Sequence, residues 1–386
     1  MSEKGPEYYD YIIAGAGCAG LALADALLAS PVLRDKRILL LDHDFSEIDE
    51  RTWCFWETEA GPYEHLVRKK WDSLTVFDDN GKIPVVPSPY EYKMVPGRDF
   101  RLDIHSRMDK RPENVTLLET EVLSVSPDGT VRTKAGNFCG GQVFDSRFPD
   151  IPDEERHPLW LWQHFKGYFV RTDEDFFDDR QATLMDFRTE QFGYTRFFYV
   201  LPLSPREALV EYTVFSPELL SERKEYDEAL REYIGEKLGL ENYTVSGEEF
   251  GKIPMTAQRF ARCSGKVFYV GSAGGASKAS TGYTFSRILR QVRGVVECLE
   301  RGESLEKIAP GKAKHCFYDG VLLDVLSHNR FPGRDIFSRM FRRNSGYRVL
   351  SFLDERAALA DDLKIIFSCP VFPFLRAFFS YSRVWL

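Results

Sequence analysis

The amino-acid sequence predicts a mixed α/β protein with an N-terminal β-α-β unit, a middle region of strands and a helical C-terminal region. The β-α-β unit is indicated by two short apolar runs, Asp10–Ala14 and Arg37–Asp42, on either side of a helical run rich in small residues, Leu21–Leu28. Strand-like runs then recur between residues 73 and 270. After Pro310 the pattern is mainly helical.

Composition narrows the class of protein. The chain has 386 residues, of which 43% are hydrophobic and 28% charged, so it is globular. Aromatic residues make up 14%, which favours a large apolar ligand. The net charge of −8 argues against nucleic-acid binding. Residues 301–386 differ from the rest, with 14 basic and 9 acidic residues.

The seven cysteines are scattered and form no CxxC motif, which excludes a disulfide framework or zinc ribbon and favours a reducing compartment. We predict no metal site and no signal peptide. The segment closest to a membrane span, Leu363–Phe379, contains Lys364, Pro370, Pro373 and Arg376, so we do not expect it to cross a bilayer.

Further elements are predicted in chain order. The strands are Ser73–Phe77, Gly141–Asp145, Phe197–Leu201, Ala208–Val214 and Lys266–Val270, and a helix follows over Phe285–Glu300.

A glycine motif connects the first strand to the first helix. Gly15 permits a tight turn, Gly17 lets the backbone approach a pyrophosphate, and Gly20 lets the helix pack close to the strand. The N-terminus of the helix then presents free N–H groups to phosphate. Asp42 ends the next strand and can accept a hydrogen bond from a ribose hydroxyl, which predicts FAD or NAD.

A second glycine-rich turn favours FAD. The run Val270–Gly275 follows a strand and leads through Ser280–Tyr283 into a helix. This order is that of FAD proteins of the glutathione-reductase and hydroxylase type, in which the late turn borders the flavin. Ser272 stands where many such proteins carry Asp. An ordinary glycine-rich loop is the alternative.

We therefore predict a FAD-binding Rossmann-type fold with a mostly antiparallel substrate domain and a helical C-terminal region. The FAD-binding domain comprises residues 1–80, 97–150 and 250–300, and the substrate domain comprises 81–96 and 151–249. Residues 301–386 form a helical, membrane-associating region.

Several motifs carry a resemblance over nearly the whole chain. They are Asp10–Gly20, Arg51–Glu57, Val143–Arg147, Leu161–Gly167, Met185–Arg188, Tyr199–Leu203, Leu209–Thr213 and Lys278–Tyr283. In these motifs the chain resembles bacterial lycopene β-cyclases. Plant-type members have Phe-Leu-Glu-Glu-Thr where this chain has Leu209–Thr213, so the acid that the family needs falls on Glu211, while Tyr212 replaces the second acid. The proline common before Thr-Gly-Tyr is absent here.

The resemblance implies an isomerase that cyclises the ψ ends of lycopene, by way of γ-carotene, to the β-ionone rings of β-carotene. It also implies FAD that is active in its reduced form, with NAD(P)H as the electron source. No obligate protein partner is inferred. The predicted cofactor-binding residues are Gly15, Gly17, Gly20, Asp42, Arg51, Gly271, Ser272, Thr281 and Gly282.

Glu211 suits acid catalysis by its position in an apolar strand, because burial keeps a carboxylic acid protonated. If its neighbours face away, it shares a face with Leu209 and Thr213. The alternative is a solvent-exposed face, and the sequence leaves open whether Glu211 or the flavin delivers the first proton. Secondary candidates are His164 and Asp186 for proton handling, and Trp53, Phe55, Trp56, Trp160 and Trp162 for cation stabilisation.

The C-terminal region combines basic and aromatic residues. The arginines are Arg330, Arg334, Arg339, Arg342, Arg343 and Arg348, and the apolar runs are Ile365–Phe367, Phe372–Leu375 and Phe378–Phe379. This pattern predicts peripheral contact with the cytoplasmic side of a membrane, with closure of the core as the alternative.

Two rival functions remain open at the level of sequence. One is a FAD-dependent monooxygenase or a polyprenyl or carotenoid reductase, and the other is a non-catalytic lipid-binding protein on the same fold. A reductase consumes NAD(P)H stoichiometrically and an oxygenase requires O2. A binding protein of the second kind typically loses FAD, whereas the glycine motif is intact here.

Overall fold

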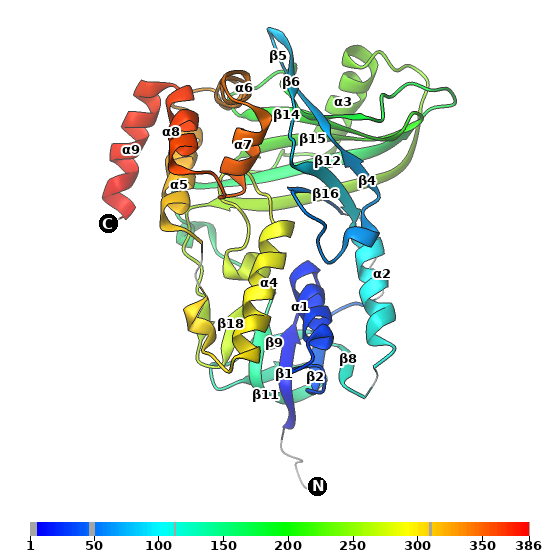
Figure 1. Ribbon diagram of the computed structural model, residues 1–386, viewed down its shortest axis with the longest axis vertical. Helices are drawn as coiled ribbons and strands as arrows, with labels where there is room; N and C mark the ends of the chain where they lie inside the picture. Colours follow the sequence, from blue (N-terminus) through cyan, green and yellow to red (C-terminus); the bar gives the residue numbers. More distant parts are fainter. Residues whose placement is uncertain (1–5, 46–50, 112, 309–310, 386) are drawn as a thin grey trace.

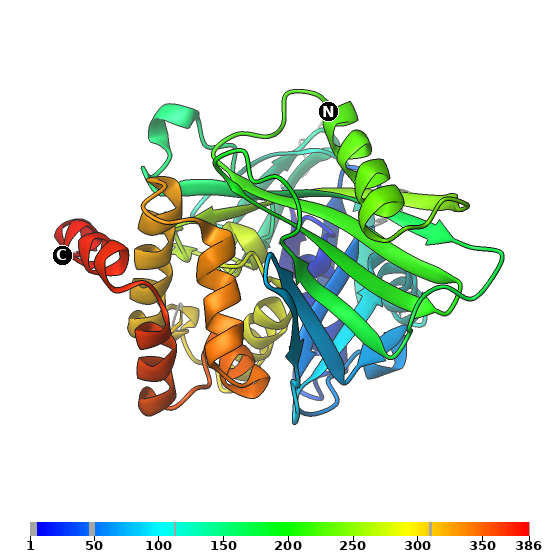
Figure 2. The same cartoon turned by 90° about the horizontal axis from the view of Figure 1, so that it is seen from above.

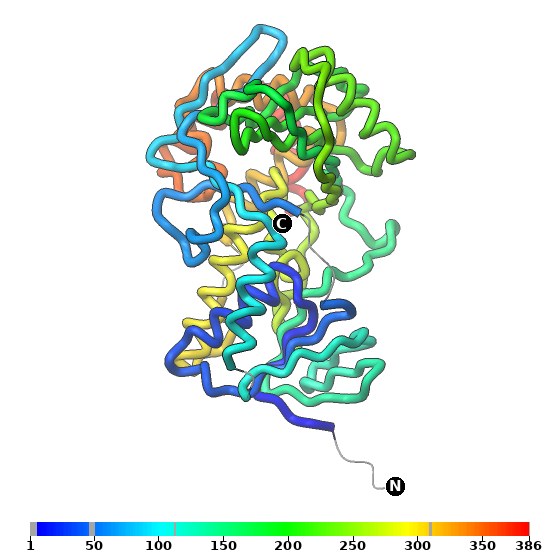
Figure 3. Tube along the Cα trace, turned by 90° about the vertical axis from the view of Figure 1, so that its right-hand side faces the viewer, coloured from blue at the N-terminus to red at the C-terminus, as the bar shows by residue number. Residues whose placement is uncertain are grey.

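The computed structural model describes residues 6–45, 51–111, 113–308 and 311–385. In these residues two large sheets lie one above the other along the long axis of the molecule (Figures 1 and 3). The predicted N-terminal unit lies in the lower half, and the middle strands and most C-terminal helices lie in the upper half.

The first sheet is built on the predicted β-α-β unit. Its central strand β1 (Glu7–Ala14) pairs in parallel with β2 (Ile38–Asp42) and β11 (Gly136–Asp145). The other strands are β8 (Val115–Glu119), β9 (Val122–Val125), β10 (Thr130–Thr133), β17 (Cys263–Ser264) and β18 (Val267–Tyr269). Helices α1 (Cys18–Ala29), α2 (Gly97–Met108) and α4 (Phe285–Glu300) supply the core on one face. The apolar runs of β1 and β2 are buried because both sheet faces are covered.

The second sheet is mostly antiparallel, as predicted. Its strands, in spatial order, are β16 (Thr244–Thr256), β12 (Trp160–Arg171), β15 (Glu207–Ser216), β14 (Thr195–Ser204), β13 (Gln181–Asp186), β5 (Ser73–Asp78) and β6 (Gly81–Val85). Only the β13–β5 pair is parallel among these described strands. Helix α3 (Arg223–Glu232) packs on one face and C-terminal helices on the other (Figure 2).

A small sheet connects the two halves. It consists of β3 (Thr52–Glu57), β7 (Glu91–Pro96) and β4 (Lys69–Trp71). Successive residues of β3 point to opposite faces, so Phe55 packs in the core of the first sheet and Trp56 in the core of the second. Strand β3 therefore packs in the cores of both halves.

The C-terminal region is helical, as predicted. Its helices are α5 (Ala313–Ser327), α6 (Gly333–Arg343), α7 (Gly346–Leu353), α8 (Leu359–Ser368) and α9 (Val371–Trp385). Phe337 and Phe341 of α6 and Leu350 of α7 are buried against the second sheet, so this region closes the core. None of the described helices is by itself long and apolar enough to cross a membrane. On length and composition α8 and α9 qualify only as a pair, and the chain bends by 116° between them.

Two details differ from expectation. Strand β5 pairs with β13 in the second sheet, so the domain boundary that we drew at residue 80 cuts the β5–β6 hairpin, and β16 runs past the boundary at 250. The second detail concerns the C-terminal arginines that we expected to contact a membrane, since most of them pair with acidic side chains. Arg330 pairs with Asp324, Arg334 with Asp79, Arg342 with Asp78 and Arg348 with Asp361.

Candidate active site

The first glycine loop has the geometry of a phosphate-binding turn. Gly15 has a φ of +98°, and a Cβ on Gly20 would lie 1.9 Å from the Gly15 carbonyl oxygen, so both positions require glycine. Gly17 differs, because its φ of −73° suits any residue and a Cβ there would meet no described heavy atom within 4 Å. The space beside Gly17 is therefore open to a ligand.

Asp42 and the start of α1 complete this loop. The Asp42 carboxylate accepts hydrogen bonds from the backbone N–H groups of Ala16 and His43, at 2.5 and 2.7 Å. The N-cap residue of α1, Gly17, has no side chain with which to cap the helix. The N-terminus of α1 therefore borders the open space beside Gly17, where the sequence predicts an anion.

The second glycine turn lies directly against the first. Gly271 has a φ of +67°, and a Cβ there would lie 2.6 Å from the Cβ of Ala19 in α1. The Gly271 N–H donates to Gln291 Oε1 at 2.8 Å, while the Ser272 hydroxyl lies 3.1 Å from that of Ser277. The structure thus brings together two loops some 250 residues apart in sequence.

A buried ion pair anchors the loop that follows. Lys278 Nζ lies 2.9 Å from Asp319 of α5 and 3.3 Å from Glu355, and the Ser280 hydroxyl donates to Asp319 at 2.7 Å. These contacts fix the loop between the first sheet and the C-terminal helices.

Two unpartnered polar atoms lie where the loop meets the second sheet. A Cβ on Gly282 would lie 2.3 Å from Gln163 Oε1. That oxygen and the Thr281 hydroxyl are buried and have no hydrogen-bond partner among the described residues. Buried polar atoms are normally paired, so a polar group bound here is the natural complement. The residues present therefore fit the flavin that the order of the two loops predicts.

Arg51, the remaining predicted cofactor residue, directly precedes β3 and is exposed. Its carbonyl accepts a hydrogen bond from the Gly97 N–H at 2.8 Å. Its role toward a cofactor stays a prediction.

Glu211 lies on the inner face of the second sheet. Leu209 and Thr213 share this face, as predicted, while Val210 and Tyr212 pack on the opposite face beside α3. The Thr213 hydroxyl donates to Glu211 Oε1 at 2.8 Å. Glu211 is therefore half-buried on the inner face of the sheet and not on a fully solvent-exposed face, and its catalytic role stays a prediction.

A second acid beside Glu211, the buried Glu249, was not predicted. Gly167 of β12 pairs with Glu211 of β15 on one side and with Glu249 of β16 on the other, so both acids lie on the same face. Glu249 is only 4% exposed. It lies in a polar run from Ser246 to Lys252 that has no alternation to indicate a buried face, and only the strand register reveals it.

The two carboxyl groups perturb each other. Burial raises the pKa of Glu211 to about 7, against the lowering effect of hydrogen bonds from Thr213 and Glu249. The pKa of Glu249 is raised well above its usual value, chiefly by burial and secondly by the charge of Glu211. The site therefore retains a carboxylic-acid proton at neutral pH.

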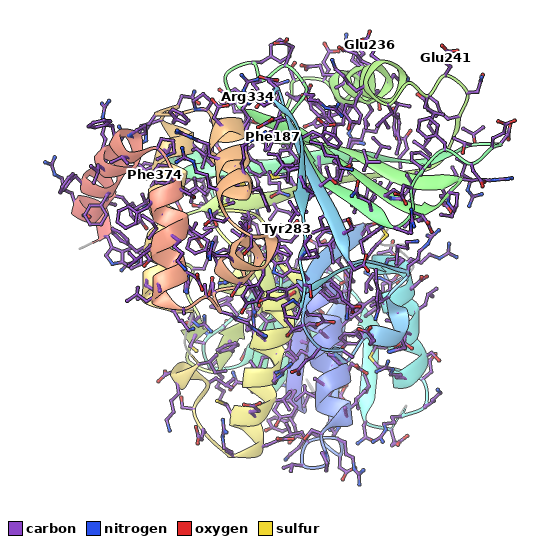
Figure 4. The ribbon with its side chains drawn as sticks, turned by 45° about the horizontal axis from the view of Figure 1, so that its top comes forward. Phe187, Glu236, Glu241, Tyr283, Arg334 and Phe374 are labelled. Atoms are coloured by element: carbon purple, nitrogen blue, oxygen red, sulfur yellow. The ribbon has the colours of Figure 1, made fainter. Side chains whose placement is uncertain are left out.

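Aromatic side chains form the wall beside these acids. Tyr199 pairs with Glu211 across β14 and β15, and its hydroxyl lies 3.5 Å from that of Tyr283. The Tyr283 hydroxyl also lies 3.3 Å from that of Tyr92, and its ring lies 4.5 Å from Trp56. Figure 4 shows Tyr283 where the two halves of the molecule meet. Trp56, Tyr199 and Tyr283 also line an apolar cavity that runs between the second sheet and helices α6 and α7.

Most of the secondary candidate residues lie away from Glu211 and Glu249. His164 is on the α3 side, bonded to Ser216 and Tyr226, and burial lowers its pKa to about 4, so it is a neutral structural histidine. Asp186 is held by Arg188 and Tyr233. Of the five aromatic candidates, Trp56 lines the cavity. Trp53 and Phe55 pack in the core of the first sheet, and Trp160 and Trp162 contact each other edge to face.

Comparison with known proteins agrees with this geometry. The model of the family described as lycopene cyclase protein matches residues 10–378. The chain belongs to this family. Over 210 residues it is 28% identical to a lycopene beta-cyclase of Paracoccus sp. (strain N81106 / MBIC 01143), a match that covers 54% of this chain and 52% of that protein.

A chloroplastic neoxanthin synthase of Solanum tuberosum is 24% identical over 340 residues, covering 82% of this chain and 66% of that one. The chain thus spans about half to two thirds of the length of these curated relatives.

Solved structures show the fold. A geranylgeranyl bacteriochlorophyll reductase-like protein of Thermoplasma acidophilum has a TM-score of 0.61 at 12% identity and covers 96% of this cyclase-family chain and 99% of its own. Klebsiella pneumoniae HpxO in complex with FAD has a TM-score of 0.63 at 13% identity, and the match covers 94% of this chain and 100% of the HpxO chain. The predicted fold class, that of flavin-dependent hydroxylases and reductases, is confirmed.

Proposed function

We propose that this protein is a lycopene β-cyclase that converts the ψ ends of lycopene, by way of γ-carotene, to the rings of β-carotene. The observation that carries the proposal is Glu211, a half-buried acid on the inner sheet face whose pKa is raised to about 7. A hydrocarbon substrate offers no polar group to recognise, so the enzyme needs an acid in a dry pocket and a shaped apolar wall. Glu211 supplies the acid, and its cross-strand neighbour Tyr199 lines a small apolar cavity.

The reaction is an isomerisation. Glu211 donates a proton to C2, the π electrons of the C1–C2 double bond form the new C–H bond, and C1 becomes a tertiary cation. The C5–C6 double bond attacks C1, and loss of the C6 proton gives the β-ionone ring. Thr213 orients the acid through its 2.8 Å hydrogen bond. The rings of Trp56 and Tyr283, which contact each other in the same region, would stabilise the cation.

We infer that the two glycine loops hold FAD, with Gly15, Gly17, Gly20 and Asp42 at the nucleotide end. Gly271, Ser272, Thr281 and Gly282 would border the flavin. Bound there in its reduced form, with NAD(P)H as the electron source, FAD would supply negative charge that stabilises the cation. Arg51 remains a candidate cofactor contact.

The rival reductase and monooxygenase functions are separated by redox stoichiometry. We expect purified protein with FAD and lycopene-loaded liposomes to form cyclised product without oxygen, in large excess over the NADPH consumed, because the reaction transfers no electrons. Product and NADPH are measured together by chromatography and absorbance. One NADPH per product, or product only after oxygen is admitted, would assign the protein to a rival class. Purified protein that never retains flavin would favour the lipid-binding alternative.

We also propose that α8 and α9 contact the cytoplasmic surface of a membrane, where the substrate dissolves. Phe367, Phe372 and Phe379 are 72, 84 and 62% exposed, and a folded protein rarely exposes several such side chains together. Lys364, Arg376 and Arg383 are exposed on the same two helices and favour anionic lipid. The bend between the helices suits a segment that lies on the membrane surface.

Replacing Phe372 and Phe379 together by Ser is expected to weaken binding to phosphatidylglycerol vesicles on the order of 10- to 1,000-fold, because each buried Phe contributes about 2 kcal/mol. Co-sedimentation measures the binding. Phe192→Ser is the matched control, since Phe192 is 71% exposed but lies in the loop before β14. Equal binding of the double variant and the wild type would contradict membrane contact through these helices.

A further inference from the structure

Acid catalysis needs only one carboxyl group, but here a second acid, Glu249, lies on the same sheet face as Glu211. The two side chains arise from strands on opposite sides of β12, and Gly167 is the β12 residue paired with both. A Cβ on Gly167 would lie 2.8 Å from Leu209 Cδ1 and 3.0 Å from Glu249 Cγ. Glycine at this position therefore leaves the space over β12 in which the two carboxyl groups meet.

Two carboxylates in one buried site cannot both ionise without a large energetic cost. Glu249 Oε2 is buried and has no hydrogen-bond partner among the described residues, and after burial the charge of Glu211 is what raises the pKa of Glu249 most. A proton held between the two carboxyl groups would complete this site. The other main partners are Thr213 for Glu211 and Thr52 of β3 for Glu249, and both are uncharged. The pair therefore shares one proton in the way that coupled acids do.

We propose that Glu249 is a second catalytic residue, and that Glu211 and Glu249 hold and donate the proton of cyclisation as one unit. This inference rests on the proposed function. The bridging proton passes to C2 of the substrate as the C1–C2 π electrons form the new C–H bond, and both carboxylates then face the cation at C1. After ring closure the electrons of the C6–H bond form the C5–C6 double bond, and the C6 proton returns to the pair. No proton is consumed.

The other titratable side chains that face Glu211 and Glu249 stay neutral over the pH range in which these two acids titrate. They are Cys54 of β3, Tyr92 of β7, Tyr199 of β14 and Tyr283 in the loop before α4. Burial is the largest cause that raises the pKa of each, and the pKa of Tyr283 is raised to about 12. The pair is thus the local group expected to change charge between about pH 5 and pH 9.

Titration of the protein without substrate tests the pair directly. The infrared band of protonated carboxyl is followed against pH in the full-length wild type, Glu211→Gln and Glu249→Gln. We expect the pair to contribute two steps in the wild type, on either side of the single step that each variant retains, because a shared proton splits the two ionisations. If each variant keeps one of the wild-type steps unshifted, the acids are independent and the proposal is wrong.

Gly167→Ala provides a second variant in which both acids are retained. Its methyl group displaces Glu249, so the two steps are expected to move toward each other. Unchanged spacing of the steps in a folded Gly167→Ala protein would contradict a proton shared over Gly167.

Turnover then tests the catalytic role. Glu249→Gln is expected to lower lycopene cyclisation on the order of 100- to 10,000-fold, the range for loss of a general acid. Glu248→Gln is the matched control, because Glu248 lies on the opposite face, 54% exposed, where it pairs with Lys166, and its turnover is expected to stay within about twofold. Near-normal turnover in Glu249→Gln would remove Glu249 from the chemistry. A wild type that does not cyclise lycopene would overturn the proposed function instead, and the titration would still decide whether the acids share a proton.

Discussion

Glu211→Gln is expected to abolish cyclisation, with a loss on the order of 1,000-fold or more, because an amide of the same shape has no acidic proton to give to C2. The fold should survive. The wild-type residue is half-buried and the pKa of its carboxyl is raised to about 7, so the ionised form is unfavourable there, and a neutral amide removes that cost. Thr213 can still donate its hydrogen bond to the amide oxygen.

Product formation from lycopene in liposomes measures this effect, together with thermal unfolding and flavin content. Glu207→Gln is the matched control in the same strand, because Glu207 pairs at the surface with Arg68 and Arg171. Turnover of Glu211→Gln within about tenfold of the wild type would be too high for a missing general acid and would assign the first proton to another group.

Gly17→Asp is expected to eliminate FAD binding while leaving the protein folded. The backbone at Gly17 already has a φ of −73°, and a Cβ meets no described atom within 4 Å. Asp is also a favourable residue at the N-terminal cap of a helix, which is the place of Gly17 in α1. The added carboxylate would face the phosphates, and two like charges about 4 Å apart repel by about 4 kcal/mol near a protein surface, or on the order of 1,000-fold in affinity.

Gly17→Asn separates charge from size, because its side chain has the same shape without the charge. We expect Asn to weaken FAD binding much less than Asp, as measured by flavin fluorescence during titration of the apoprotein, with circular dichroism as the check on folding. Equal and tight binding by both variants would place the phosphates away from Gly17.

Local sequence patterns predicted the elements whose stabilising contacts are also local. The β-α-β unit has its own apolar strands and small-residue helix, and Gly15 and Gly20 are dictated by a tight turn and a close approach. Alternation along β15 grouped Glu211 with Leu209 and Thr213 on one face, whereas the choice of the inner face for this group came from the family resemblance. These features could be predicted because each depends on a short stretch of chain.

The features that were missed depend on distant pairing. Glu249 lies in a polar run, and only its register with Gly167, some 80 residues earlier, shows that it is buried beside Glu211. In the same way β5 joins the second sheet through β13, about 100 residues away, which moved the domain boundary. The arginines of the C-terminal region suggested a basic patch until the structure showed that Arg342 pairs with Asp78 of β5.

The central claim is that this protein catalyses acid-initiated cyclisation, and deuterium labelling tests it most directly. Wild-type protein with reduced FAD and lycopene-loaded liposomes is incubated in D2O without oxygen, and the product is analysed by mass spectrometry and NMR. The account predicts one deuterium at C2 of each new β-ionone ring, because the buried acids exchange with solvent before each turnover. Product of a single turnover, formed after the protein has equilibrated in D2O, that contains no deuterium at C2 would contradict acid initiation.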